Sequence, residues 1–536
     1  MNDHPNPSPT VIWSVAGHDS GGGAGLSADQ RAADAFGVHL CPVLAAITAQ
    51  STVAVTRVAP VPADLFNAQL DTLQADLPPR AIKTGLLGDP QQVQWLAQRI
   101  DRLRAQGPLP VVVDPVLRAT TGATLADDAL RDALVRWLLP RASLLTPNRR
   151  EALALLGLPP HDDTAAPALA SALRALGAEA VLVTGGDDGG ELSRDWLDTP
   201  HAQGWLCLPR LATPHNHGTG CTLASGAAAA MALGWVATDA AVLGKMLATQ
   251  ALRHARPVGH GAGPVIATPG FGTDPSLLPV LSMGDTPIQT PHPPPSQHRD
   301  NRPADGVYAI VDPAERVEAC IAGGAALVQL RIKATGGHPP PAGLRAELAR
   351  AIGAGRRSGT GVVINDHWRL ALELGATALH LGQEDLLALT PADHRALADA
   401  RAAGVSLGLS SHSLWELCRA RGLQPDLIAC GPVWPTATKA MPWRPQGLDN
   451  LAWWARMAGA PVVGIGGILG PEQLADVARS GAAFGCVVRG LGDDPRHSLP
   501  AWTDAWRRGR QAGPLPVPAL PHATLGQNPP ATPQHP

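Results

Sequence analysis

Short runs of apolar residues recur along the whole chain, and longer stretches that mix apolar and polar positions separate them. Apolar runs between glycine-rich or polar turns are typical of buried strands, and the mixed stretches favour helices. In the first half, strands are predicted at residues 11–16, 43–48, 81–84, 110–114, 143–146 and 180–184. Helices are predicted at 26–36, 90–106 and 127–138. This alternation indicates a three-layer α/β sandwich around a mainly parallel sheet.

The second half repeats a strand–helix unit. The predicted strands are residues 307–311, 326–331, 361–365, 377–381, 405–409, 427–430, 461–465 and 484–488. Strand–helix units in this number are typical of a closed (β/α)8 barrel of the TIM type. Because barrel active sites lie at the carboxyl ends of the strands, functional residues are expected directly after these runs.

Length and proline content predict the domain organisation. A chain of 536 residues exceeds one ordinary domain. The first domain is expected at residues 10–272 and the second at 305–512. Proline-rich stretches predict a linker at 273–304 and a disordered tail at 513–536.

Composition excludes several classes of protein. Charged residues make up 16% of the chain and the net charge is −3, so neither a nucleic-acid groove nor a membrane surface is expected. Seven scattered cysteines without a Cys-x-x-Cys pattern indicate reduced thiols in the cytoplasm rather than a zinc site. We expect small-molecule substrates, no membrane span and no signal peptide. Assembly into a homo-oligomer stays open.

Two glycine-rich turns precede predicted helices. Residues 217–221 (His-Gly-Thr-Gly-Cys) open into a run of small residues, where unpaired backbone N–H groups would form an anion site. Cys221 falls at the start of that helix, and its thiol is expected to have a lowered pKa and to act as a base or nucleophile. A loop with a buried cysteine is the alternative. In the other turn, residues 17–25, Asp19 either caps the turn or touches a ligand.

Five motifs in the first half occur in a characteristic order. They are residues 17–25 (Gly-x-Asp-Ser-Gly-Gly-Gly-Ala-Gly), 83–87 (Lys-Thr-Gly-Leu-Leu), 114–116 (Asp-Pro-Val), 146–152 (Thr-Pro-Asn-x-x-Glu-Ala) and 217–222 (His-Gly-Thr-Gly-Cys-Thr). Together they resemble the hydroxymethylpyrimidine/phosphomethylpyrimidine kinases, a branch of the ribokinase-like fold. Related sugar kinases carry Asp in place of Cys221, so the cysteine favours the pyrimidine branch. A pyridoxal-type kinase is the nearest alternative.

This resemblance implies roles for individual residues. Cys221 would be the base for the attacking hydroxyl or phosphate, and the backbone at Gly218 and Gly220 would hold the transferring phosphoryl group. The implied contacts with ATP and Mg²⁺ come from Asp114, Asn148, Glu151 and Thr184, and those with the pyrimidine come from Asp19 and Gln50.

One strand end departs from that family. The usual Lys-Gly-Gly-His is replaced by Thr184-Gly185-Gly186-Asp187. Loss of the lysine would remove a cation from the phosphates, and its replacement by Arg118, Arg149 or another cation stays open.

Polar side chains follow the predicted barrel strands, as expected for an active site. They include Gln329, Arg331, Lys333, Asn365, Asp366, His380, Gln383, Glu384, Asp385, Ser410, His412, Thr436, Thr438 and Lys439, and Gly466 and Gly467 end the seventh strand. Arg331, Lys333 and Lys439 are cations suited to a diphosphate. Asp366 and Asp385 could share Mg²⁺ bound to it. The glycines offer backbone N–H groups to a phosphate.

These barrel motifs resemble thiamine-phosphate synthase over about residues 305–495. The resemblance implies that Mg²⁺ on Asp366 and Asp385 assists departure of diphosphate from the pyrimidine and that the thiazole nitrogen attacks the methylene. It also assigns the diphosphate and pyrimidine side to Gln329, Arg331, Lys333, Asn365, Ser410 and Lys439. The same resemblance implies that the thiazole phosphate is bound by Thr436, Thr438, Gly466, Gly467, Val488 and Arg489. Arg489 replaces the usual serine and could tighten phosphate binding or block the pocket; we expect it to be tolerated.

The two resemblances are consecutive steps of one pathway, which indicates a bifunctional enzyme of thiamine biosynthesis that uses ATP and Mg²⁺. Two alternatives stay open. One domain could be a binding or regulatory module without turnover, or the first half could be a pyridoxal-type kinase.

Overall fold

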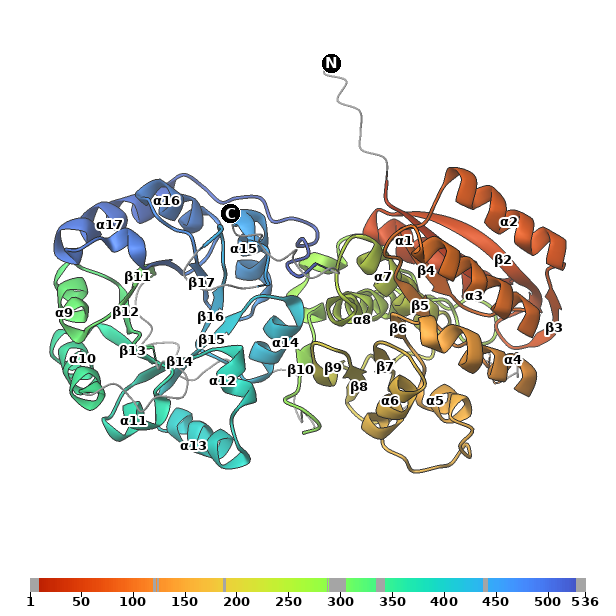
Figure 1. The fold of residues 1–536 in the computed structure, drawn as a ribbon, viewed down its shortest axis with the longest axis horizontal. Coiled ribbons are helices and arrows are strands. Elements are labelled where there is room, and N and C mark those ends of the chain that lie inside the picture. The colour runs from red at the N-terminus through yellow and green to blue at the C-terminus, as the bar shows by residue number, and fades with distance from the viewer. Residues whose placement is uncertain are drawn as a thin grey trace, which may run out of the picture. The chain divides into compact units, whose positions relative to one another are not determined.

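The computed structural model describes residues 9–118, 122, 125–186, 189–286, 288, 305–333, 343–436 and 442–526. The chain divides into two compact units, residues 1–291 and 292–536 (Figure 1). No helix among the described residues is long and apolar enough to cross a membrane.

The first unit is built on one ten-stranded sheet. Its order is β10-β9-β8-β7-β6-β5-β4-β1-β2-β3. The strands are β1 (Val11–Asp19), β2 (His39–Gln50), β3 (Val55–Pro60), β4 (Ala81–Thr84), β5 (Val111–Val113), β6 (Leu144–Leu145), β7 (Val181–Val183), β8 (Leu192–Asp198), β9 (Gln203–Pro209) and β10 (Val280–Leu281). All six predicted strands are present, and they form the parallel centre of the sheet.

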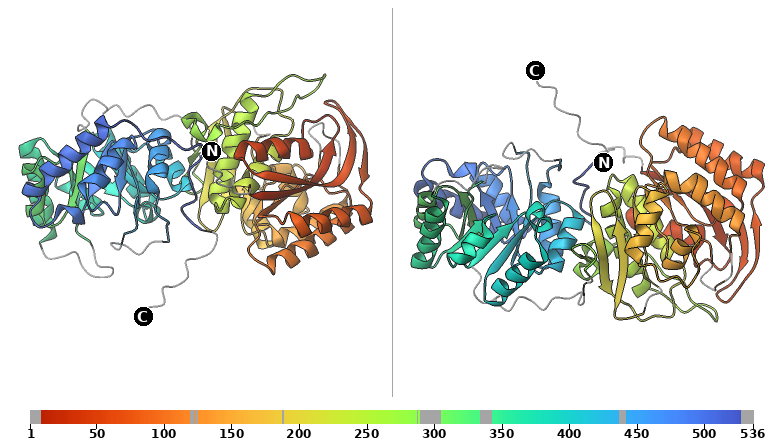
Figure 2. Two further views of the ribbon diagram at one scale, coloured as in Figure 1. Left: turned by 90° about the horizontal axis from the view of Figure 1, so that it is seen from above. Right: turned by 60° about the horizontal axis from the view of Figure 1, so that its bottom comes forward.

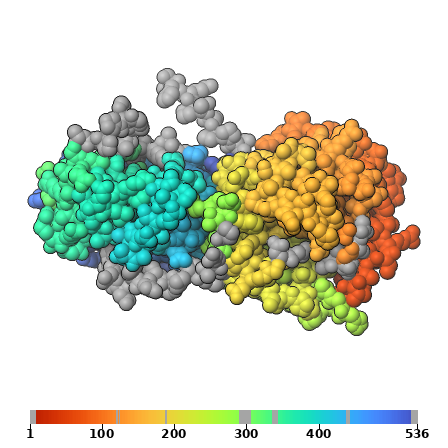
Figure 3. All heavy atoms as spheres, turned by 90° about the horizontal axis from the view of Figure 1, so that it is seen from below, coloured from red at the N-terminus to blue at the C-terminus, as the bar shows by residue number. Residues whose placement is uncertain are grey.

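Helices cover both faces of this sheet, which gives the expected ribokinase-like sandwich (Figure 2). They are α1 (Gly25–Phe36), α2 (Ala63–Asp76), α3 (Pro90–Arg104), α4 (Asp128–Ala133), α5 (Arg149–Leu155), α6 (Ala166–Ala175), α7 (Thr219–Ala232) and α8 (Ala237–Arg253). Helix α7 packs on both α1 and α8, and α1 and α7 pack on the central strands. Apolar residues of α2 to α6 pack on the other face, and Phe66, Val93 and Leu169 are fully buried there. The orange and yellow atoms of this unit form one continuous face in Figure 3.

The antiparallel edges of the sheet were not predicted from the sequence. β3 pairs with β2, and β8, β9 and β10 extend the sheet beyond β7. β10 lies inside the segment expected to be linker, because Val280 and Leu281 pair with Cys207 and Leu206. The predicted start of the linker at residue 273 is therefore wrong, since apolar side chains of that segment complete the core.

The second unit is a closed barrel of parallel strands (Figure 1). The strands are β11 (Gly306–Val311), β12 (Leu327–Leu330), β13 (Gly361–Asn365), β14 (Ala378–Leu381), β15 (Ser406–Ser411), β16 (Leu427–Cys430), β17 (Val462–Ile465) and β18 (Phe484–Val487). Each of these eight strands was predicted. Tyr308, Val363, Ala429 and Phe484 pack within its core.

Helices surround the barrel strands. They are α9 (Ala314–Ala322), α10 (Leu344–Ser358), α11 (Trp368–Glu373), α12 (Gln383–Leu387), α13 (Pro391–Ala402), α14 (Leu414–Gly422), α15 (Gly447–Met457), α16 (Pro471–Arg479) and α17 (Pro495–Gln511). The expectation of a disordered tail is wrong for residues 513–526. Leu515 N–H donates to Arg479 O, and Ala523 and Thr524 are buried, because this segment has apolar and polar partners on the barrel.

Truncation of Leu281 to alanine tests whether β10 belongs to the first unit. The Leu281 side chain is 1% exposed, so Leu281→Ala should lower the free energy of unfolding of this unit by about 2–4 kcal/mol. The measurement is the urea midpoint of the first unit's unfolding transition. Leu233→Ala, at a side chain 39% exposed, is the matched control and should change the free energy by less than about 1 kcal/mol. Equal midpoints for the two variants would contradict the placement of β10 in this core.

Candidate functional sites

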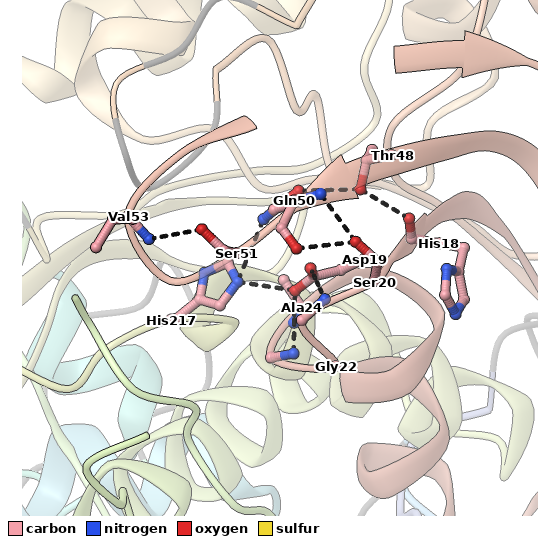
Figure 4. Close-up of polar contacts among 12 residues, drawn as sticks. His18, Asp19, Ser20, Gly22, Ala24, Thr48, Gln50, Ser51, Val53 and His217 are labelled. Atoms are coloured by element: carbon pink, nitrogen blue, oxygen red, sulfur yellow. Dashed lines mark hydrogen bonds and ion pairs between the residues drawn. The ribbon is translucent and has the colours of Figure 1, made fainter. Parts of the chain in front are cut away.

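The glycine-rich turn after β1 is organised by the carboxylate of Asp19 (Figure 4). Asp19 Oδ1 accepts from Gly21 N–H at 2.8 Å, and Oδ2 accepts from Gly23 N–H at 3.0 Å and Ala24 N–H at 2.8 Å. Burial works to raise the pKa of Asp19, but the hydrogen bonds from His217 and these amides outweigh burial and lower it. Of the two interpretations drawn from the sequence, the contacts present are those of a cap.

His217 joins this turn to the second glycine-rich turn. Its Nε2 lies 2.9 Å from Asp19 Oδ2 and 3.4 Å from Gln50 Nε2. The Gln50 amide also lies 3.3 Å from Thr48 Oγ1, and the polar ends of these side chains converge in Figure 4. In the sequence, His217 stands within a motif, but the motif alone predicts no role for it. Its position beside Asp19 was unpredictable because 198 residues separate the two.

The second turn brings the start of α7 against the first. Gly218 has φ +88°, and a Cβ there would lie 2.2 Å from Gly23 O, so only glycine fits. Around Gly220, no neighbour among the described residues lies within 4 Å of an added Cβ, so its space is open. Cys221 is the third residue of α7, where the first-turn N–H groups have no partner within the helix. This helix start is compatible with the predicted anion site, which stays a prediction.

A buried polar cluster lies beneath Cys221. Lys83 Nζ donates to Asp29 Oδ1 and Oδ2 at 2.9 and 3.0 Å, and neither side chain is exposed. Ser14 and Ser225 donate to the same carboxylate at 2.6 and 2.7 Å. Lys83 Nζ also lies 3.8 Å from Asp114 Oδ2. The sequence marked Lys83 and Asp114 as strand-end residues but gave no sign that Asp29 on α1 joins them.

The predicted lowering of the Cys221 pKa is wrong for the free protein. Burial raises the pKa of the Cys221 thiol to about 12, and the nearby Lys83 ammonium only partly offsets this. The carboxylates of Asp114 and Asp29 raise the pKa further, because a second negative charge beside them is unfavourable. Helix-start position alone was a poor guide because the acidic neighbours come from other elements.

The ends of β6 and β7 carry the other predicted residues of this site. Asn148 and Glu151 form a capping box on α5, in which Asn148 N–H donates to Glu151 Oε2 at 3.0 Å. Thr184 bridges to Asn148 at the end of β7. Beside Gly185, Asp195 pairs with Lys245 of α8 at 2.7 Å, and both side chains are buried. Sequence reasoning missed Lys245 because it lies mid-helix in an ordinary amphipathic pattern.

All of these predicted residues meet at one cavity of about 760 Å³. Its lining includes Asp19, Gln50, Lys83, Asp114, Arg118, Asn148, Glu151, Thr184, Asp195, Gly218, Gly220, Cys221 and Lys245. Arg149 instead donates to Thr164 O and Asp162 O, outside this lining. The cavity combines a helix N-terminus, cations and oxygen ligands, which suits a polyphosphate.

In the barrel, the carboxylates of Asp366 and Asp385 influence each other at the ends of β13 and β14. Burial and the charge of Asp385 raise the pKa of Asp366, against the effect of Arg331. Asp366 has φ +63°, a left-handed backbone conformation that is unfavourable for a residue with a Cβ. The surrounding structure must therefore hold Asp366 in this conformation. Asp385 Oδ2 accepts from Gly382 N–H at 2.9 Å. The predicted pair of carboxylates is thus brought together.

His380 and Gln383 link the end of β14 to that of β15. His380 Nε2 lies 3.0 Å from Ser410 Oγ, and Gln383 Nε2 donates to Ser410 O at 2.7 Å. Burial, with a smaller effect from Arg331, lowers the pKa of His380 to about 4, so its ring is neutral at pH 7. Ser410 therefore has its orientation set by neighbours.

The other predicted barrel residues differ in their exposure. Gln329 and Asn365 are buried, whereas Lys333 and Arg489 are exposed. Thr436 and Val488 are half-buried. Gly466 and Gly467 have φ of +96° and +73°, and a Cβ on either would lie within 3 Å of the segment 432–435, so glycine is required. Thr438 and Lys439 lie outside the described residues.

The raised pKa of Asp114 predicts a pH-dependent stability of the first unit. Burial raises this pKa from 3.8 to about 6, so the folded protein holds the proton more tightly than the unfolded chain. Without divalent cations, the contribution of Asp114 to the free energy of unfolding should therefore fall by up to about 3 kcal/mol as pH rises from about 4 to 6. Unfolding free energies of the unmodified protein and Asp114→Asn across this range measure it, and Asp64→Asn on the exposed face of α2 is the control. A constant difference between the Asp114 variant and the unmodified protein would refute the assignment.

Comparison with known proteins matches both units. Residues 19–266 match the phosphomethylpyrimidine kinase family and residues 307–491 the thiamine monophosphate synthase family. A hydroxymethylpyrimidine/phosphomethylpyrimidine kinase of Synechococcus elongatus is 41% identical over 48% of this chain and 96% of its own length. A thiamine-phosphate synthase of Rhizobium etli is 44% identical over 39% of this chain and 98% of its own.

One relative spans both units. A chloroplastic thiamine biosynthetic bifunctional enzyme of Arabidopsis thaliana is 33% identical over 469 residues, which are 85% of this chain and 84% of that enzyme. The order of the two domains, the kinase cavity and the barrel site all agree with this match. The chain belongs to the family of bifunctional thiamine biosynthetic enzymes, in which a phosphomethylpyrimidine kinase and a thiamine-phosphate synthase share one polypeptide.

Proposed function

We propose that the first unit uses ATP to phosphorylate hydroxymethylpyrimidine twice and that the barrel couples the resulting diphosphate to thiazole phosphate. The products of the second reaction would be thiamine phosphate and pyrophosphate. The match to a bifunctional enzyme over 85% of the chain carries this proposal. A cytoplasmic location is part of it and agrees with seven free cysteines.

In the kinase site, the glycine turn before α7 is proposed to hold the transferring phosphoryl group. Phosphoryl transfer depends mainly on alignment and charge stabilisation, and the N–H groups at Gly220 and Cys221 together with Lys83 supply positive potential. The Cys221 thiol is protonated in the free protein, so it acts as the base only after losing that proton. That proton would pass to solvent, and the Lys83 ammonium beside the thiol favours the thiolate that remains.

Asp114 also fits a Mg²⁺ ion. Its Oδ2 is buried, lies 3.8 Å from Lys83 Nζ and accepts no hydrogen bond of ordinary length within the described residues, which leaves a hard oxygen ligand available in the cavity. Glu151 lines the same cavity from the start of α5. When bound, the ion would neutralise phosphate charge. Asp114 would hold it directly and Glu151 through water.

Lys245 is proposed to replace the strand-end lysine that this chain lacks. Its ammonium lies in the cavity beside the Thr184–Gly185 strand end, where Asp195 Oδ2 accepts from it and Asp195 Oδ1 accepts from Gly185 N–H at 3.0 Å. A buried cation at this edge can serve the ATP phosphates from a different helix. This supports a functional ATP site although Thr184 stands in place of the usual lysine.

In the barrel, Asp366 and Asp385 fit a Mg²⁺ ion that accompanies the diphosphate. Their charges oppose each other, and a divalent cation between them would remove that repulsion. When bound, it would neutralise the leaving group. Arg331 lies close enough to act on the charge of Asp366.

The remaining barrel contacts suit positioning rather than proton transfer. Neutral His380 fixes Ser410 on the pyrimidine side. Gly466, Gly467 and Thr436 are proposed to take the thiazole phosphate. The thiazole nitrogen is already a neutral nucleophile, so no side-chain base is needed.

One incubation tests both activities. Purified protein, hydroxymethylpyrimidine, ATP, Mg²⁺ and thiazole phosphate should give thiamine phosphate by mass spectrometry. Cys221→Ala should reduce the kinase rate by about 10²–10⁴-fold and leave coupling of supplied diphosphate unchanged. Asp366→Asn should instead reduce the rate of coupling, leave the kinase rate unchanged and let the diphosphate accumulate.

The outcomes separate the alternatives. Unchanged hydroxymethylpyrimidine alongside rapid phosphorylation of pyridoxal would reject the pyrimidine kinase in favour of a pyridoxal-type kinase. Tight binding of substrates to one unit without turnover would instead identify that unit as a binding module. Monophosphate alone would place the defect at the second phosphorylation.

The role of Lys245 has its own test. Lys245→Gln should lower kcat/KM for ATP by about 10–100-fold, mainly through KM, because a phosphate contact is lost. The double variant Lys245→Gln/Asp195→Asn separates this from the cost of leaving Asp195 unpaired. If Lys245 only neutralises Asp195, the double variant should recover activity, and that recovery would refute the proposal. Arg253→Gln on the exposed end of α8 is the matched control.

A further inference from the structure

The C-terminal segment that follows α17 returns to the carboxyl end of the barrel. We name residues 521–524 the strap; Pro521, Ala523 and Thr524 are buried. Thr524 Oγ1 donates to His412 O at 2.7 Å, and Arg444 N–H donates to Thr524 O at 2.7 Å. His412 directly follows β15, and Arg444 lies between β16 and α15. The strap therefore ties two strand exits together.

Two buried amides continue this connection. Asn450 Oδ1 accepts from His522 N–H at 2.7 Å, and Asn450 Nδ2 donates to His522 O at 3.0 Å. Asn450 Nδ2 also donates to Gln446 Oε1 at 3.0 Å, and Gln446 Nε2 donates to His412 O at 2.8 Å. Asn450 and Gln446 are fully buried, so these amides depend on one another and on the strap for their partners.

From Gln446 the network reaches the proposed substrate loops. Backbone N–H groups of Gln446 and Gly447 donate to Pro432 O and Val433 O at 2.7 and 3.0 Å. Val433 and Trp434 N–H in turn donate to Ile465 O and Gly466 O at 2.8 and 3.1 Å. The same strand exits carry Ser410, Thr436 and Gly467.

We propose that the strap is a positioning element of the synthase, which holds the substrate-binding loops after β15, β16 and β17 in register. This inference rests on the proposed synthase function. Without the strap, Arg444 N–H and the Asn450 amide lose their partners in a buried region, and the loops would shift to find others. Displacements of about 1 Å in such loops can cost about 10²-fold in rate.

Removal of the strap is the direct test. A chain that ends after residue 512 should lose at least about 10-fold in kcat/KM for coupling supplied diphosphate to thiazole phosphate. Its kinase activity should stay within about two-fold, because none of the strap contacts given above involves the first unit. A chain that ends after residue 526 keeps every strap contact and should match the unmodified protein. A synthetic peptide of residues 513–526 should restore part of the lost synthase activity.

A point variant covers the case in which the shortened barrel fails to fold. Thr524→Val keeps the shape of the side chain but cannot donate to His412 O, so the synthase KM for thiazole phosphate should rise by about 3–10-fold. Val517→Ala, at a side chain 37% exposed and outside the strap, keeps every strap contact and is the matched control, with no change in KM expected. Faster amide hydrogen exchange in residues 442–450 of the Thr524 variant would accompany the rise in KM.

The outcomes are separable from those of the proposed function. No thiamine phosphate from the unmodified protein would reject the synthase assignment itself, and the strap proposal with it. Activity in the unmodified protein with equal kcat and KM in folded shortened and Thr524→Val chains would overturn the strap alone. Faster exchange in residues 442–450 without any change in KM would show a structural contact only, and would equally overturn it.

Discussion

The buried ion pair between Lys83 and Asp29 is the interaction on which the first active site depends. A lysine and an aspartate without exposure are costly to bury, and here each is satisfied only because the other and two serines are in place. These four groups come from β1, α1, β4 and α7. The charge pair thus sets how the helix that carries Cys221 lies on the central strands.

The same cluster determines the chemistry available at Cys221. A thiol at a helix start is ordinarily activated, yet here it faces Asp114 and Asp29, and burial holds its proton. Phosphates and Mg²⁺ would change that balance on binding. In the free protein, Cys221 is therefore a neutral thiol beside an acid of raised pKa.

The barrel uses hydrogen bonds where the sandwich uses charge. Asp366 is held at positive φ, His380 is kept neutral, and Gln446 and Asn450 link successive strand exits to the chain's C-terminal segment. Such a network positions groups without placing a base near the substrates. That agrees with a coupling reaction in which the nucleophile is already neutral.

Local patterns in the sequence were enough to predict both architectures. Apolar runs identified the six central strands of the sandwich and the eight strands of the barrel, because buried parallel strands must be nearly continuous in apolar residues. The carboxyl-end rule then placed Asp114 near Asn148 in the first unit and Asp366 near Asp385 in the second, since parallel strands of one sheet end at the same edge. Motif spacing supplied the rest of the candidate list.

Only the tertiary structure decided which side chains face which. The partnership of Asp29 with Lys83, of His217 with Asp19 and of Lys245 with Asp195 joins elements 50 or more residues apart, and nothing in local periodicity encodes it. The same holds for β10 and the strap, whose proline-rich surroundings suggested linker and tail. Burial, with smaller contributions from Asp114 and Asp29 on other elements, also reversed the expected pKa shift of Cys221, because a titrating group responds to its whole surroundings in space rather than to its place in a helix.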